Sequence, residues 1–379
     1  MDDTVPIEPR PAAGGRRRAH SSEELGRSPA LTVRPRLIGL ATAVPPYVMG
    51  QHDIAERVRV HFADASAGML ERLMPIYGNT GIERRHACVP LDWHRTLHGW
   101  RERNEAYIEN AVGLLERAAI DCLAEARVHP HEVDAIVVVS SSGIATPSLD
   151  ALLINRLSMR TDVKRLPIFG LGCAGGVLGL ARSVDLARVD PNAKILFLVV
   201  ELCSLCFRRN DMTAANFVST ALFADGAAAA LIASGGKGLA FGPSGEHTWP
   251  DSLDVMGWDI QDDGLKVVLS RDLPTFVRTQ MRAVTVQFLQ RYGFDLADVA
   301  HFVCHPGGAK VLTALEEAFG IAEGTLVAGR EVLRDYGNMS SATVLFVLDR
   351  MLKAGAGGRM LMTAMGPGFT AAFQIIEAA

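Results

Sequence analysis

A unit of strand, polar turn and helix occurs twice in this 379-residue chain, and the duplication limits the folds that the chain can adopt. The matched segments are AIVVVSSSG at 135–143 with HFVCHPGG at 301–308, GLGCAGGVLGLARSVDLA at 170–187 with DYGNMSSATVLFVLDRML at 335–352, and LFLVVE at 196–201 with RMLMTAMG at 359–366. Ser141 and His305 are 164 residues apart, and Cys173 and Asn338 are 165 apart. This constant spacing predicts two related halves, and because two copies are too few for a solenoid, we expect them to pack against each other.

Short apolar runs alternate with amphipathic stretches from Arg36 onward. Residues 106–126 carry apolar side chains at three- and four-residue steps, which predicts a helix with one buried stripe. The apolar runs at 133–142, 194–201 and 227–234 predict buried strands. This alternation is typical of an α/β fold in which helices cover both faces of a mixed sheet.

The chain divides into three parts by composition and by the pattern of its apolar residues. Residues 1–33 are rich in Pro, Gly, Ser and Arg and show little periodicity, so we expect a disordered N-terminal tail. Residues 34–235 then form an N-terminal half that carries Cys173. Residues 236–379 form a C-terminal half that carries His305 and Asn338.

Charge and cysteine content narrow the class of protein. A net charge of −4 gives no reason to expect a nucleic acid as the main partner. Six cysteines in a chain of this length, with no signal peptide, predict reduced thiols and a cytoplasmic protein. The longest strongly apolar run, ILFLVV at 195–200, is too short for a membrane span.

Cys173 lies in a glycine-rich turn at the start of a predicted helix. The unpaired N–H groups and the dipole of that helix would lower the pKa of its thiol and favour a nucleophile. A small buried side chain in a glycine-lined helix contact is the structural alternative. His305 follows a predicted strand, and Asn338 begins the helix that matches the Cys173 helix, where asparagine is also a common N-cap. The duplication brings the three residues to one place.

Cysteine, histidine and asparagine together suit acyl-transfer chemistry. A thiolate holds an acyl group as a thioester, while neutral histidine and asparagine present two N–H donors to a carbonyl oxygen. Those donors would stabilise the enolate that forms when a β-carboxylate leaves as carbon dioxide. The resulting reaction, a decarboxylative Claisen condensation, needs no metal and no redox cofactor. A papain-like cysteine hydrolase is the competing interpretation.

The motifs GLGCAGG, HPGGAKVL, YGNMSSATVLFVLDRM, ALFADGAAAALI and MGPGF, in this order, resemble those of type III polyketide synthases. The resemblance spans roughly residues 35–375. This chalcone synthase-like branch has the thiolase fold, five αβαβα layers built from two duplicated halves. The resemblance implies a cytoplasmic homodimer that uses acyl-CoA and malonyl-CoA as substrates, with no separate cofactor and no carrier protein.

The resemblance also implies roles for single residues. Cys173 would be the acylated nucleophile, and His305 and Asn338 the decarboxylation and oxyanion pair. The gatekeeper and cavity residues would be Phe223, Ser141, Cys203, Cys206, Val267, Thr146, Gly366 and Pro367, with Thr146 reaching into the partner subunit. Coenzyme A would contact Arg72, Gly307 and Gly308, helped by Arg84 or Arg85. No second Cys-x-x-Cys accompanies Cys203 and Cys206, so we expect no metal site.

Departures from the plant enzymes suggest the product class. Valine at 267, where those enzymes carry a second gatekeeping phenylalanine, and the small side chains of Ser141, Cys203 and Cys206 suggest room for a bulky starter. We therefore expect a medium- or long-chain fatty acyl-CoA starter and an alkylpyrone or alkylresorcinol product. A malonyl-primed tetrahydroxynaphthalene or phloroglucinol synthase and a carrier-protein-dependent ketosynthase are the alternatives.

Overall fold

Nine strands form one hydrogen-bonded sheet in the computed structural model, which describes residues 34–62 and 67–378. The predicted tail at 1–33 lies outside the described residues. The sheet order is β11-β12-β13-β8-β1-β7-β6-β4-β5. Its strands are β1 (Arg36–Ala43), β4 (Ala135–Val139), β5 (Lys164–Ile168), β6 (Lys194–Leu202), β7 (Asp225–Ala233), β8 (Leu239–Thr248), β11 (His301–Cys304), β12 (Arg359–Gly366) and β13 (Thr370–Glu377).

The duplication is visible in the strand order. Outward from the β8–β1 junction, β1-β7-β6-β4 matches β8-β13-β12-β11. In both series the first two pairings are antiparallel and the third is parallel. The junction itself contains only two residue pairs, so the halves meet through a narrow seam. The boundary placed at 235/236 falls between β7 and β8.

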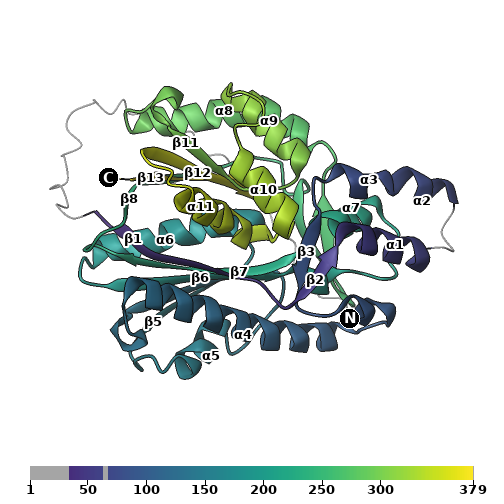
Figure 1. Cartoon of the computed structure of the whole chain (residues 1–379), viewed down its shortest axis with the longest axis horizontal. Helices are drawn as coiled ribbons and strands as arrows, with labels where there is room; N and C mark the ends of the chain where they lie inside the picture. Colours follow the sequence, from purple (N-terminus) through teal and green to yellow (C-terminus); the bar gives the residue numbers. More distant parts are fainter. Residues whose placement is uncertain (1–33, 63–66, 379) are drawn as a thin grey trace, which may run out of the picture. The chain divides into compact units, whose positions relative to one another are not determined.

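Helices cover and separate the two series of strands (Figure 1). The outer helices α4 (Trp100–Ala126) and α5 (Leu149–Arg156) lie on one side, and α8 (Leu273–Arg291) and α9 (Ala309–Phe319) on the other. Between the two series lie α6 (Gly175–Val189) and α11 (Thr343–Lys353). This arrangement confirms the five-layer αβαβα architecture expected from the resemblance.

Alternating side chains of β6 show why the strand is apolar throughout. Ile195, Phe197 and Val199 face the central helices, whereas the intervening leucines and Val200 face α4. A strand buried on both faces needs a continuous apolar run, as the sequence predicts. The helix expected at 106–126 is also present. It begins earlier, at Trp100, and the sequence analysis missed this start because the first turns are polar and carry no apolar period.

Shorter elements surround the layers. They are the pair β2 (Tyr47–Gly50) and β3 (Arg84–Ala87), the hairpin β9 (Met256–Gln261) and β10 (Gly264–Leu269), and the helices α1 (Gln51–His61), α2 (Ala67–Leu73), α3 (Pro75–Asn79), α7 (Ala214–Leu222) and α10 (Val327–Tyr336). Among the helices of residues 34–62 and 67–378, none combines the length and apolar character needed to cross a membrane.

Close packing at the N-terminal end of α6 requires glycine. A Cβ atom added to Gly176 would lie 2.1 Å from the Ser341 carbonyl oxygen and 2.8 Å from a methyl group of Val344. Ser341 belongs to the short 3-10 turn Ser340–Ala342, which leads into α11. The two central helices therefore approach each other where the two matched turns meet.

Two glycine substitutions, one at this contact and one away from it, should change the free energy of unfolding in opposite directions. Gly176→Ala should lower the free energy of unfolding by about 1–3 kcal/mol, because the methyl group overlaps Ser341. Gly113→Ala in α4 is the matched control, since an added Cβ there meets no atom within 4 Å. It should stabilise the protein by about 0.5–1 kcal/mol through helix propensity. Urea unfolding at fixed protein concentration measures both, and equal midpoints for Gly176→Ala and wild type would contradict the packing.

Candidate active site

One cavity of about 820 Å³ receives side chains from both halves of the chain. Cys173, His305 and Asn338 all line this space, which we call the main cavity. The sequence expectation that these residues meet is therefore right. Their chemical roles remain predictions.

Cys173 lies in the 3-10 turn Gly172–Ala174, which continues directly into α6. Gly172 adopts φ +46°, and a Cβ atom there would lie 2.6 Å from the Pro367 ring. A Cβ on Gly366 would lie 2.3 Å from the Leu171 carbonyl oxygen. The Gly366-Pro367 segment thus packs against the cysteine turn, and Pro367 also lines the main cavity.

The Ser141 side chain forms hydrogen bonds with the turn that contains Cys173. Its hydroxyl accepts hydrogen bonds from the backbone N–H groups of Gly170 and Gly172, each at 3.2 Å. Ser141 is buried and belongs to the lining of neither cavity described here, so its role as a cavity residue stays a prediction. Because its hydroxyl oxygen accepts from two glycine N–H groups, the Ser141 side chain points toward the turn that contains Cys173.

The thiol of Cys173 is in a different electrostatic state from the one expected. Burial raises its pKa to about 11, opposed by a contact of 3.5 Å with the Ser340 hydroxyl and reinforced by the nearby Glu201 carboxyl. The expected lowering of the Cys173 pKa is therefore wrong. Burial in the protein outweighs the hydrogen bonds that favour the thiolate.

His305 follows β11 and presents an unpaired imidazole. Its backbone N–H donates to the Thr363 carbonyl at 2.9 Å, which ties it to β12. Both ring nitrogens are buried and have no hydrogen-bond partner among the described residues. Burial lowers the pKa of His305 to about 4, so the ring is neutral at pH 7.

The Asn338 side chain makes a local turn and still offers a donor. Its Oδ1 accepts a hydrogen bond from the Ser340 backbone N–H at 2.8 Å, whereas the N-cap position of the following 3-10 turn is Met339. Its Nδ2 donates to the Gly307 carbonyl at 3.3 Å. Because an amide nitrogen carries two N–H groups, one remains for a ligand.

Phe223, Trp258 and Val267 separate the main cavity from a second, smaller one of about 80 Å³. Phe223 and Val267 were expected near this position. Trp258 was missed, although it pairs with Val267 across the β9–β10 hairpin. Alternation along a hairpin could have revealed it, had the hairpin been predicted.

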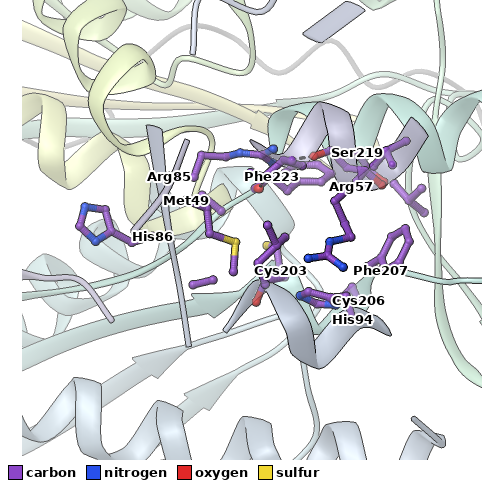
Figure 2. Close-up of a pocket in the computed structure, with 18 of the residues that line it drawn as sticks. Met49, Arg57, Arg85, His86, His94, Cys203, Cys206, Phe207, Ser219 and Phe223 are labelled. Atoms are coloured by element: carbon purple, nitrogen blue, oxygen red, sulfur yellow. Dashed lines mark hydrogen bonds between the residues drawn. The ribbon is translucent and has the colours of Figure 1, made fainter. Parts of the chain in front are cut away.

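Cys203 and Cys206 line the second cavity, together with Phe223 (Figure 2). Both are free cysteines. Within the described ranges, no group of three or more His, Cys, Asp or Glu side chains has an arrangement that could hold a metal ion. Thr146 lies exposed in the loop before α5, and its reach into a partner subunit remains a prediction.

The mouth of the main cavity differs in part from the expected coenzyme A site. Arg72, Gly307 and Gly308 line it as predicted. Arg84 and Arg85 do not line the main cavity, and their help in binding coenzyme A stays a prediction. Arg84 pairs with Asp335, and buried Arg85 donates to the carbonyls of Thr220 and Phe223. Two cationic side chains that the sequence analysis missed, Arg271 and Lys310, line the cavity instead.

Comparison with known proteins agrees with the fold. The family model of the N-terminal domain of chalcone and stilbene synthases matches residues 23–236, and that of the C-terminal domain matches 241–376. The chain belongs to this family, the type III polyketide synthases.

Individual members of the family match over most of their length. A putative chalcone synthase of Bacillus subtilis is 36% identical, over 88% of this chain and 96% of that protein. A 1,3,6,8-tetrahydroxynaphthalene synthase of Streptomyces peucetius is 36% identical, over 89% and 91% respectively. The crystal structure of the tetrahydroxynaphthalene synthase of Streptomyces coelicolor superposes with a TM-score of 0.86 at 28% identity, covering 91% of this chain and all of that one.

The cations at the mouth predict a binding effect without a chemical one. Arg72→Ala, Arg271→Ala and Lys310→Ala should each raise the KM for malonyl-CoA about three- to fivefold, since an exposed charge pair contributes up to about 1 kcal/mol. The kcat should change little, because phosphate contacts bind substrate and transition state alike. The matched control is Arg84→Ala. Initial-rate kinetics at low ionic strength measure the effect, and unchanged KM values in all three variants would contradict this mouth.

Proposed function

We propose that this type III polyketide synthase joins an acyl-CoA starter to malonyl-CoA units by decarboxylative Claisen condensation. The observation that carries the proposal is the unpaired, buried imidazole of His305, which lines the same cavity as the Asn338 amide and the Cys173 thiol. Buried polar groups without partners are costly, so their partner is expected to be a ligand. A thioester carbonyl oxygen fits two N–H donors.

The first step transfers the acyl group. Cys173 begins as a thiol and His305 as a neutral imidazole, so the nucleophile arises when the thiol proton moves to the imidazole. The sulfur attacks the thioester carbonyl of the starter. The bond between that carbonyl and the coenzyme A sulfur breaks, and coenzyme A leaves as its thiol with the proton from His305.

The second step makes the carbon–carbon bond. In bound malonyl-CoA, the bond to the carboxylate breaks and carbon dioxide leaves. The electron pair passes to the thioester as an enolate, which the N–H groups of His305 and Asn338 stabilise. The carbanion attacks the acyl group on Cys173, the bond from that carbonyl to the sulfur breaks, and the thiolate that leaves takes a proton from solvent. The substrates are all coenzyme A thioesters, so this series of reaction steps requires no metal and no redox cofactor.

The preferred starter is a medium- or long-chain fatty acyl-CoA, extended by two or three malonyl units and closed to an alkylpyrone or alkylresorcinol. Support comes from the valine at 267 and from the second cavity behind it, which Cys203 and Cys206 line with small side chains. The resemblance of the chain to a tetrahydroxynaphthalene synthase favours a second candidate, in which malonyl-CoA is also the starter.

Removal of the nucleophile should separate condensation from decarboxylation. Cys173→Ala should abolish polyketide product and the acyl-enzyme mass, yet retain malonyl-CoA decarboxylation, because His305 and Asn338 remain. Asn338→Ala should reduce decarboxylation on the order of 10²-fold by loss of one oxyanion donor. Mass spectrometry of the intact protein and release of carbon dioxide measure both. Polyketide formation by Cys173→Ala would contradict the assignment.

A panel of acyl-CoA starters tests the product class and the role of Trp258 as a wall between the two cavities. Wild type should extend fatty acyl-CoA starters, and Trp258→Ala should shift the optimum to longer chains because the two cavities would join. Trp258→Phe is the matched control and should retain the wild-type optimum. Products are identified by mass spectrometry.

The same panel distinguishes the alternatives. Refusal of every fatty acyl starter, with only malonyl-primed naphthalene or phloroglucinol formed, would overturn the alkyl assignment. Free acid released without malonyl-CoA would indicate a cysteine hydrolase. Inertness toward free malonyl-CoA would indicate a ketosynthase that requires a carrier protein.

A further inference from the structure

The second cavity has an apolar body and a basic lining (Figure 2). Its basic side chains are Arg57, His61, Arg85, His86 and His94. Among the described residues that line it, none is Asp or Glu. An all-aliphatic acyl chain gains nothing from cations in such a place, so the lining calls for a different explanation.

Arg85 is the buried member of this group. Its Nη1 donates to the Thr220 and Phe223 carbonyls at 2.6 and 2.7 Å. Its Nε and Nη2 are buried and have no hydrogen-bond partner in the described part of the chain. Burial lowers the pKa of Arg85 to about 10, so the guanidinium is charged at pH 7. A buried charge with unmet N–H groups is costly unless an acceptor arrives.

Arg57 provides a second cation from α1. Its guanidinium extends into the space beside His94, Cys206 and Phe207 (Figure 2). Its Nη2 donates to the Asp92 carboxylate at 2.7 Å. Asp92 is 70% exposed at its side chain and is not part of the cavity lining, so water weakens its hold on the guanidinium.

The other titratable groups around the cavity leave its charge positive. His94 has its pKa lowered to about 4 by burial and by the neighbouring His98, Arg57, Arg85 and His61, so it is neutral at pH 7. The pKa values of His61 and His86 are also lowered, mainly by burial. The Asp225 carboxyl is engaged by Ser204 and by the Cys88 backbone N–H.

We propose that the second cavity binds a carboxylate at the far end of the acyl chain, so that among medium- and long-chain acyl-CoA starters those with an ω-carboxylate are extended best. The inference rests on the proposed condensation at Cys173 and names the class of its starter. The methylene groups would contact the apolar part of the lining, which includes Met49, Ile54 and Phe207. The carboxylate would accept hydrogen bonds from Arg57, since guanidinium groups match carboxylates in geometry, and the buried charge of Arg85 would attract it from the cavity wall.

Two starters of equal chain length test the proposal. Octanoyl-CoA ends in a methyl group, and suberoyl-CoA carries a carboxylate at the same carbon. Wild type should extend suberoyl-CoA with a kcat/KM at least about tenfold higher than that of octanoyl-CoA, because a hydrogen-bonded charge is worth that factor or more. In Arg57→Leu, which removes the charge and retains apolar bulk, this ratio should fall about tenfold.

Controls separate recognition from folding. Arg59→Leu changes an exposed arginine on the same helix that pairs with Glu56 and does not line the second cavity, and it should keep the wild-type ratio. Should Arg57→Leu unfold, Arg57→Gln with its thermal midpoint measured in parallel replaces it. Direct binding of suberate to wild type by calorimetry, weakened in the Arg57 variant and absent for octanoate, gives a readout independent of turnover.

The outcomes are distinguishable. Octanoyl-CoA extended as well as suberoyl-CoA, or a ratio unchanged in the Arg57 variant, overturns the carboxylate site while the proposed condensation stands. Extension of neither starter, with malonyl-CoA alone giving product, overturns the fatty acyl starter and this inference together. No product from any starter overturns the condensation itself.

Discussion

The contact between the N-terminal ends of the two central helices is the constraint on which the rest of the structure depends. Gly176 allows α6 to approach the Ser341 carbonyl of the turn before α11. That approach places Cys173 and Asn338, from turns 165 residues apart, at one cavity. Glu201 also stabilises this contact, since its carboxyl accepts hydrogen bonds from the Ser341 hydroxyl and the Ser141 backbone N–H.

Burial governs the chemistry at this contact more than any single charge. It raises the pKa of the Cys173 thiol and lowers that of the His305 imidazole, so both are neutral before substrate binds. In the proposed condensation, a neutral imidazole would keep an N–H donor for the enolate oxygen. The thiol proton would pass to the imidazole during acyl transfer, and the exclusion of water would strengthen each hydrogen bond to the developing negative charge.

The sequence predicted well where one local pattern controls the outcome. The apolar run of β6, the helix at 106–126 and the glycine-rich turn of Cys173 each have a period or a turn that can be read directly. It failed where several segments must meet. Arg85 was expected to help bind coenzyme A, but its guanidinium donates to the Phe223 carbonyl, and Arg271 and Lys310 line the main cavity. Nothing adjacent to these three cations in sequence shows which way their side chains turn.

What the sequence determined by itself was the duplicated α/β architecture and the three residues Cys173, His305 and Asn338, because turns that repeat at a constant spacing must meet when the halves pack. Only the tertiary structure decided the protonation of Cys173, the inward hydrogen bonds of Ser141 and the cationic lining around Arg57 and Arg85. These properties depend on how much water is excluded and on which distant side chains share one cavity. Both are set by packing between segments far apart in the chain.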